Sequence, residues 1–259
     1  MIERINNDCE SSTKIKVDSD EFTKDYESGA QVLASIAEEI SGIPIPKKTL
    51  EDWRTLLASV RIVDDRLDHI YDNQERSKFE ENMIRLLKGE NINLSNDTYL
   101  KKASQDVIKL LSTLDDNQKK YFINSISNFF EITEKIKIED DEKEYVKLTR
   151  LEGQIASRVF ISFLPEEFKQ SNNYQKLLHA MTRLGRMGNS FDNLIDFKSD
   201  YAENQIKIKP NILNRALLLG AILTDGASIL KDGVLSRNTV KDTLLLAGKH
   251  IKSAVKKSN

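Results

Sequence analysis

Acidic residues with metal-binding spacing occur in "RIVDDRLD", a segment whose other residues are largely apolar. Arg61, Asp64 and Asp68 are three and four residues apart, so a helix places them in one narrow sector, with Asp65 off to one side. Carboxylates that share a helix face suit hard divalent cations such as Mg²⁺. In a chain with 41 Asp and Glu residues, an ordinary solvated helix face is the competing interpretation.

A second acidic group favours the metal-binding interpretation. Asp192, Asp196 and Asp200 in "GNSFDNLIDFKSD" are four residues apart and would form one repulsive stripe along a helix. Gly185 and Gly188 share that stripe, although glycine inside a helix costs about 0.5–1 kcal/mol relative to alanine. Space for a ligand is one reason to keep them. Because Mg²⁺ combines a few carboxylates with phosphate oxygens of a substrate, the two groups predict a diphosphate substrate.

The elements that must position these acids are helices. The chain of 259 residues has only 4 prolines and 10 glycines, and apolar residues recur at helical intervals between them. We expect helices near residues 20–40, 50–71, 75–88, 97–113, 116–137, 141–163, 172–202, 210–231 and 237–256. No repeat of fixed period and no linker interrupts this pattern. The sequence therefore predicts a flexible N-terminal segment, residues 1–19, and one all-α domain, residues 20–259.

Composition limits the partners. The net charge of −2 gives no general attraction to nucleic acid or anionic lipid. Cys9 is the single cysteine, which rules out a disulfide within the chain and favours a reducing, cytoplasmic setting. No window approaches ~18 uninterrupted apolar residues, so we expect no transmembrane segment. Peripheral membrane contact and the oligomeric state stay open.

These motifs resemble those of the class I isoprenoid synthases, and most nearly the squalene/phytoene synthase type. In that family an arginine and two variable residues precede a DDxxD-like run, as Arg61 precedes Asp64 here. The family's second motif follows a Leu-Gly pair, and it aligns with this chain without a gap. The residues matched there are Leu184, Gly185, Asn189, Asp192, Asp196 and Asp200. Asn189 stands where the family has glutamine, and Asp192 where it has asparagine.

Two shorter segments extend the resemblance. "RLEGQIASRVF" is similar to the family's small-residue helix break and puts Gly153 in the matching position. "DGVLSRNTV" looks like a segment near the family's C-terminus, with Ser236 and Arg237 matching. The resemblance covers roughly residues 20–250.

The resemblance implies a class I terpenoid synthase-like helical bundle around a central cavity. Two or three Mg²⁺ ions would bind there with the diphosphate of farnesyl or geranylgeranyl diphosphate, which would ionise, release diphosphate and condense with a second chain. Catalysis would depend on Asp64, Asp68, Asp192 and Asp196. The metal ligands would be Asp64, Asp65, Asp68, Asp192, Asp196 and Asp200. The substrate-binding residues would be Arg61, Arg150, Gly153, Gly185, Gly188, Asn189 and Lys198.

Three other functions remain open. "DNLIDFKSD" also resembles the metal-binding triad of terpene cyclases, and "SFDNLID" the second aspartate motif of chain-elongating prenyl diphosphate synthases. Against elongation, no pair of arginines follows the first motif, where "DNQERS" offers only Arg76. The chain could also be a non-catalytic member of the same fold that acts as a scaffold. Substrate chain length, the product and any use of NADPH are not determined by the sequence.

Overall fold

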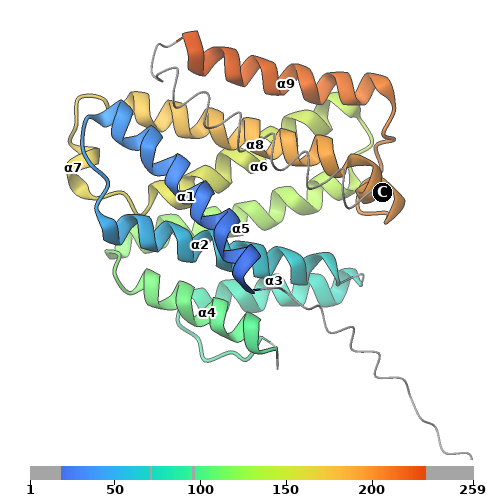
Figure 1. Cartoon of the computed structure of the whole chain (residues 1–259). Helices are drawn as coiled ribbons and strands as arrows, with labels where there is room; N and C mark the ends of the chain where they lie inside the picture. Colours follow the sequence, from blue (N-terminus) through green and yellow to red (C-terminus); the bar gives the residue numbers. More distant parts are fainter. Residues whose placement is uncertain (1–18, 71, 95–96, 232–259) are drawn as a thin grey trace, which may run out of the picture.

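The described part of the chain is entirely helical. The computed structural model describes residues 19–70, 72–94 and 97–231, and these residues form nine helices and no strands (Figure 1). The helices are α1 (Ser19–Ser41), α2 (Lys47–Asp68), α3 (Asn73–Leu87), α4 (Thr98–Leu111), α5 (Asp116–Ile138), α6 (Glu142–Ile161), α7 (Glu166–Lys169), α8 (Tyr174–Ala202) and α9 (Ile212–Lys231). The predicted all-α class is confirmed.

Eight predicted helices agree with the structure to within about three residues at each end. The structure adds α7, a single turn inside a segment expected to be a break. The predicted helix at residues 237–256, with Ser236 and Arg237, lies outside the described residues, and so does the expected N-terminal segment apart from Ser19.

Aspartates in the connecting segments start four of these helices. The side chains of Asp72, Asp97, Asp115 and Asp141 accept backbone N–H groups in the first turns of α3, α4, α5 and α6. Each satisfies donors that no carbonyl within the helix can reach. Part of the acidic content therefore has a local structural role.

The helices pack in an order that places α6 near the centre. α6 lies between α5 and α8, and α9 lies along the other side of α8 (Figure 1). The larger core joins α1 to α5 with parts of α6 and α8, and the indole N–H of fully buried Trp53 on α2 donates to the Phe160 carbonyl on α6 at 3.0 Å. A smaller core around Tyr145 and Phe197 joins α5, α6, α8 and α9.

Two glycines set the separation of α6 and α8. A Cβ atom added at Gly153 would overlap the carbonyl oxygen of Gly185 and lie 2.7 Å from the Asn189 Cβ, and one added at Gly185 would overlap the Gly153 carbonyl. Gly185 therefore has a packing reason for being glycine. A Cβ at Gly188 meets no atom within 4 Å.

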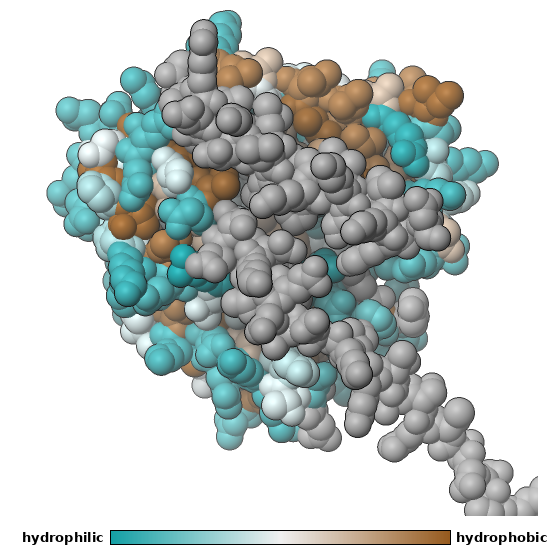
Figure 2. Space-filling view, viewed as in Figure 1, coloured by the Kyte–Doolittle hydropathy of each residue, from teal (hydrophilic) through white to brown (hydrophobic). Residues whose placement is uncertain are grey.

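Helix α9 is the most apolar of the helices described. Within the described residues it is the one helix long and apolar enough to cross a membrane by length and composition. Its exposed side chains are Ile212, Leu213, Leu219, Leu223 and Leu230, and Figure 2 shows hydrophobic surface along it. A helix packed against others in a soluble protein meets the same test, and α9 packs on α8 with Asp225 fully buried. The finding is therefore weak support for a membrane span.

Candidate functional site

Both acidic groups lie at the C-terminal ends of helices. Asp64 stands in the last turns of α2, and Asp192, Asp196 and Asp200 occupy the last three turns of α8. Asp64 and Asp200 are half-buried, whereas Asp192 and Asp196 are exposed. The negative end of a helix dipole disfavours carboxylates by typically 0.3–1 kcal/mol each. A bound cation would relieve this unfavourable arrangement.

Asp65 and Asp68 are the other two acids of the first motif. Asp65 is half-buried, one position round the helix from Asp64. Asp68 is the last residue of α2, and its side chain is outside the described part of the structure. The predicted grouping of Asp64 with Asp68 therefore stays a prediction.

Glu152 on α6 connects the two acidic groups, although the sequence did not single it out. Its carboxyl is buried and accepts a hydrogen bond from Asn189 Nδ2 on α8 at 2.7 Å. The same amide donates to the Thr149 carbonyl at 2.8 Å. Asp64 on α2 lies close enough that its charge acts on the pKa of Glu152. Glu152 thus contacts Asn189, one turn before Asp192 on α8, and feels the charge of Asp64 on α2.

The surroundings of Glu152 disfavour its ionised form. Burial raises its pKa above the ordinary value of 4.5, and the charge of Asp64 adds to that rise against the hydrogen bonds from Thr133 and Asn189. Thr133 Oγ1 lies 2.5 Å from Glu152 Oε1 and 3.0 Å from the Phe129 carbonyl oxygen. The hydroxyl has one hydrogen and the carbonyl can only accept. When the Glu152 carboxyl is protonated, it donates to Thr133 Oγ1, and the Thr133 hydroxyl donates its own hydrogen to the Phe129 carbonyl. Both contacts are then hydrogen bonds.

Tyr145 on α6 indicates that the C-terminal end of the acidic stripe on α8, at Asp200, faces the same interior as Glu152. The Tyr145 hydroxyl donates to Asn193 Oδ1 at 2.8 Å, and the Asn193 amide donates to the Asn189 carbonyl at 3.0 Å. Burial raises the pKa of Tyr145, and the charges of Asp200 and Glu152 raise it further. Glu152 is thus under the influence of Asp64, and Tyr145 under that of Asp200. Neither Glu152 nor Tyr145 was predicted, because their partners lie on other helices.

A pocket of about 730 Å³ opens where α2 and α8 end. Its lining includes Ile70, Arg76, Lys137, Tyr201 and Lys207. Glu203 also lines the pocket, and Arg76 and Lys137 both form ion pairs with Glu134. The pocket therefore carries charges of both signs beside the C-terminal ends of the two acidic helices.

The buried Arg76 ties α2 to α5. It donates to the Leu67 carbonyl at 2.7 Å and forms an ion pair with Glu134 on α5 at 2.6 Å. A cation near the last carbonyls of a helix is favourable. Arg76 thus fixes the end of α2 that carries the first motif.

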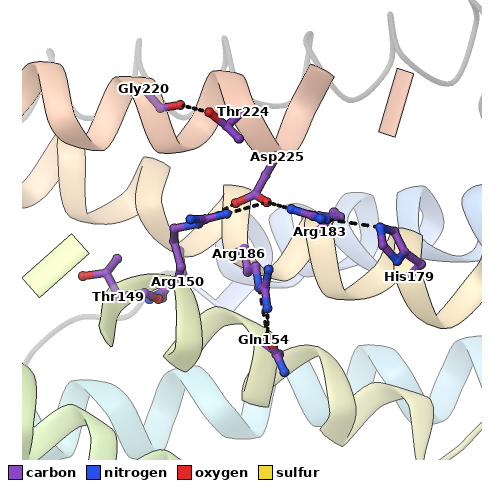
Figure 3. Close-up of polar contacts among 10 residues, drawn as sticks. Thr149, Arg150, Gln154, His179, Arg183, Arg186, Gly220, Thr224 and Asp225 are labelled. Carbon is purple, nitrogen blue, oxygen red and sulfur yellow. Dashed lines mark hydrogen bonds and ion pairs between the residues drawn. The ribbon is translucent and has the colours of Figure 1, made fainter. Parts of the chain in front are cut away.

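The predicted basic residues lie in different places. Arg61 is half-exposed and contacts Asp64 Oδ2 through Nη1 at 3.2 Å. Lys198 is exposed on α8. Arg150 is about 200° round α6 from Glu152 and binds Asp225 of α9 through two hydrogen bonds of 2.9 and 3.0 Å (Figure 3). A contact between Arg150 and the diphosphate would require this ion pair to break.

The oxygen donors suit Mg²⁺ in combination with a phosphate. Among the side chains that the structure describes, no three His, Cys, Asp or Glu residues form a ready-made metal site. Mg²⁺ usually takes only one or two protein carboxylates and completes its octahedron with phosphate oxygens and water. Carboxylates from α2 and α8 fit that requirement in their chemistry.

No protein-family model, curated protein or solved structure matches the chain. The all-α class is established by the helices themselves. The likeness to class I isoprenoid synthases stays a prediction from the two acidic motifs of the sequence.

Proposed function

We propose that the protein is a Mg²⁺-dependent isoprenoid synthase that ionises an allylic prenyl diphosphate and releases diphosphate. The observation that supports this proposal is that Glu152 of α6 interacts with both helices that carry the acidic motifs. Asn189 of α8 hydrogen-bonds Glu152, and the charge of Asp64 of α2 acts on it. Acids from two helices that face one interior are the arrangement expected for metal ions that bridge a diphosphate.

The carboxylates would hold the ions. The residues proposed for this role are Asp64, Asp65 and Asp68 from α2 and Asp192, Asp196 and Asp200 from α8. Bound Mg²⁺ supplies Lewis-acid stabilisation of the leaving diphosphate. In this proposal Arg61 and Lys198 contact the diphosphate as it binds.

The raised pKa of Glu152 suits this chemistry. An ionised carboxylate there would repel both Asp64 and an incoming diphosphate. Its hydrogen bonds with Thr133 and Asn189 satisfy it without a net charge. The acids available for metal are then those at the helix ends, and Glu152 keeps the two helices in register.

Two outcomes of the ionisation are compatible with the motifs. Condensation with a second prenyl chain follows the closer resemblance, and cyclisation of one chain is the alternative. Both begin with the same loss of diphosphate, so one assay tests both. Identification of the hydrocarbon product distinguishes them.

The test is diphosphate release from geranyl, farnesyl and geranylgeranyl diphosphates in the presence of Mg²⁺. We expect release with at least one of them, its loss on chelation with EDTA, and a fall of at least about 100-fold in Asp64→Asn and Asp192→Asn, since electrostatic stabilisation of this kind is worth about that much. Asp116→Asn, at an exposed acid that starts α5, should leave the rate unchanged. No release from any substrate would contradict the proposal.

A further inference from the structure

A cluster of four arginines lies on the sides of α6 and α8 turned away from Glu152. Arg150 and Arg158 belong to one stripe of α6, eight residues apart with Gln154 between them. Arg183 and Arg186 are neighbours one turn apart on α8. We call these four residues the arginine cluster. Arg183 is nine residues from Asp192, so the two lie about 180° apart round α8.

A single buried carboxylate stands in this cluster. Asp225 of α9 is fully buried and accepts two hydrogen bonds from Arg150 and one of 2.7 Å from Arg183 Nη1 (Figure 3). Burial by itself would raise the pKa of Asp225, but the hydrogen bonds and charges of the two arginines lower it below its ordinary value. Asp225 therefore stays ionised and fixes the direction of both guanidinium groups.

The positive charge of the cluster exceeds what Asp225 compensates. Among the described residues, no carboxylate lies within ion-pair distance of Arg158 or Arg186. Arg186 donates from Nε to the neutral amide oxygen of Gln154 at 3.0 Å and makes a second contact with it through Nη2 (Figure 3). Burial lowers the pKa of Arg186, the charge of Asp225 raises it, and the charges of Arg150, Arg183 and Arg158 lower it again. An added anion would remove this repulsion.

The cluster borders a pocket of about 340 Å³. Its lining is Gln175, Leu178, His179, Thr182, Arg183 and Arg186. Most of these side chains carry hydrogen-bond donors, and neither Nη1 of Arg186 nor Nη2 of Arg183 takes part in the contacts with Gln154, Asp225 and His179. Arg183 also donates from Nε to His179 Nε2 at 3.3 Å, which holds its side chain along α8.

We propose that this pocket binds a phosphate group, with Arg186 and Arg183 as its principal ligands. Planar guanidinium groups match the oxygen geometry of phosphate. Asp225 prepares Arg183 before the ligand arrives, and Arg158 adds charge without an anionic partner in the described residues. The site lies nearer the N-terminal end of α8 than the proposed metal ligands. It needs no Mg²⁺, so it stands independently of the proposed activity.

The test is calorimetric titration of the full chain with inorganic phosphate and with pyrophosphate, in EDTA so that the carboxylates of α2 and α8 hold no metal. We expect saturable binding that weakens at least tenfold in Arg186→Gln and less in Arg186→Lys, which keeps the charge but loses the paired donors. Lys176→Gln removes the same charge from an exposed position on α8 outside the pocket lining. It should change the affinity less than twofold.

Vesicles of phosphatidic acid test whether the phosphate belongs to a lipid headgroup. Binding to vesicles but not to soluble phosphate, lost in Arg186→Gln, would assign it to a lipid. The proposal is overturned if neither soluble phosphate nor vesicles bind, or if Lys176→Gln weakens binding as much as Arg186→Gln.

If Arg186→Gln does not fold, chemical modification of the wild-type chain still tests the proposal. Phenylglyoxal modification of Arg186, read by mass spectrometry, should slow when the binding ligand is present. Equal modification with and without that ligand would overturn the proposal.

Discussion

Glu152 makes the stability of the protein depend on pH in an unusual direction. Its pKa is raised above 4.5 chiefly by burial and further by Asp64. As the pH rises from about 4.5, the unfolded chain loses this proton more readily than the folded protein does, so ionisation favours unfolding. The free energy of unfolding should therefore carry a term that falls from about pH 4.5 up to the pKa of the folded state.

We predict that Glu152→Gln removes this term. The new amide donates to Thr133 Oγ1, and its oxygen still accepts from Asn189, so both hydrogen bonds survive without an ionisable group. Relative to the wild type, the variant should be more stable near pH 8 than near pH 4, because only the wild type carries the ionisation term. Urea unfolding at about pH 4 and pH 8 measures it. An equal difference between variant and wild type at both pH values would contradict a raised pKa.

Asp225 has the opposite pH dependence. Its pKa lies below the ordinary value, so the stabilisation it provides is complete above about pH 4 and is lost as the pH falls through the lowered pKa. We predict that Asp225→Ala lowers the free energy of unfolding by about 2–4 kcal/mol at neutral pH, because Arg150 and Arg183 are left without their anion. They are 29% and 23% exposed, which keeps the value below that for a fully buried pair.

Glu131→Ala is the matched control for that measurement. Glu131 forms a single ion pair with Lys135 on the surface of α5 at 2.6 Å, and both side chains are more than half exposed. An exposed pair of this kind contributes about 0.3–0.5 kcal/mol. Chemical unfolding of the two variants beside the wild type should separate them clearly, and similar losses would show that Asp225 is not a specific link.

At the scale of elements, the crossing of α6 and α8 depends on two glycines. We predict that Gly153→Ala or Gly185→Ala destabilises the protein by about 1–3 kcal/mol or more, because the added methyl group must push a backbone carbonyl away. Gly188→Ala, on the same helix and in open space, should stabilise by about 0.5–1 kcal/mol. Thermal unfolding of the three variants gives the sign of each change in stability. The same sign for all three would contradict a close contact of α6 and α8 at Gly153 and Gly185.

Sequence reasoning succeeded for elements and not for the contacts between them. The helix of residues 116–137 is recovered as Asp116–Ile138 because apolar spacing and a capping aspartate are local signals. The four-residue α7 is too short to carry a period. Arg150 was expected at a diphosphate because no local pattern reveals Asp225, its partner 75 residues away. Glu152 was missed for the same reason, since three other helices give it its environment.

At the scale of the whole molecule, two cores share side chains. Phe129 of α5 packs against both of them, and α6 and α8 run through both. If the two cores moved apart at their boundary, Phe129 would become exposed and the contact between Gly153 and Gly185 would be lost. The two cores should therefore unfold as one cooperative unit.

The single tryptophan tests this expectation. Trp53 is fully buried in the larger core, so its fluorescence reports that core, whereas far-ultraviolet circular dichroism reports every helix. We predict coincident urea transitions by the two methods. An earlier loss of Trp53 emission with helix content retained would instead show that the larger core unfolds separately.

The glycine contact between α6 and α8 also restricts how this sequence can evolve. A side chain at either glycine would overlap the carbonyl oxygen of the other. A single mutation at either position therefore destabilises the protein before a second mutation can compensate. The helices would first have to separate, and that separation would break the Asn189 hydrogen bond to Glu152 one turn away. Descendants of this chain should therefore keep both glycines together or lose them together with the buried glutamate.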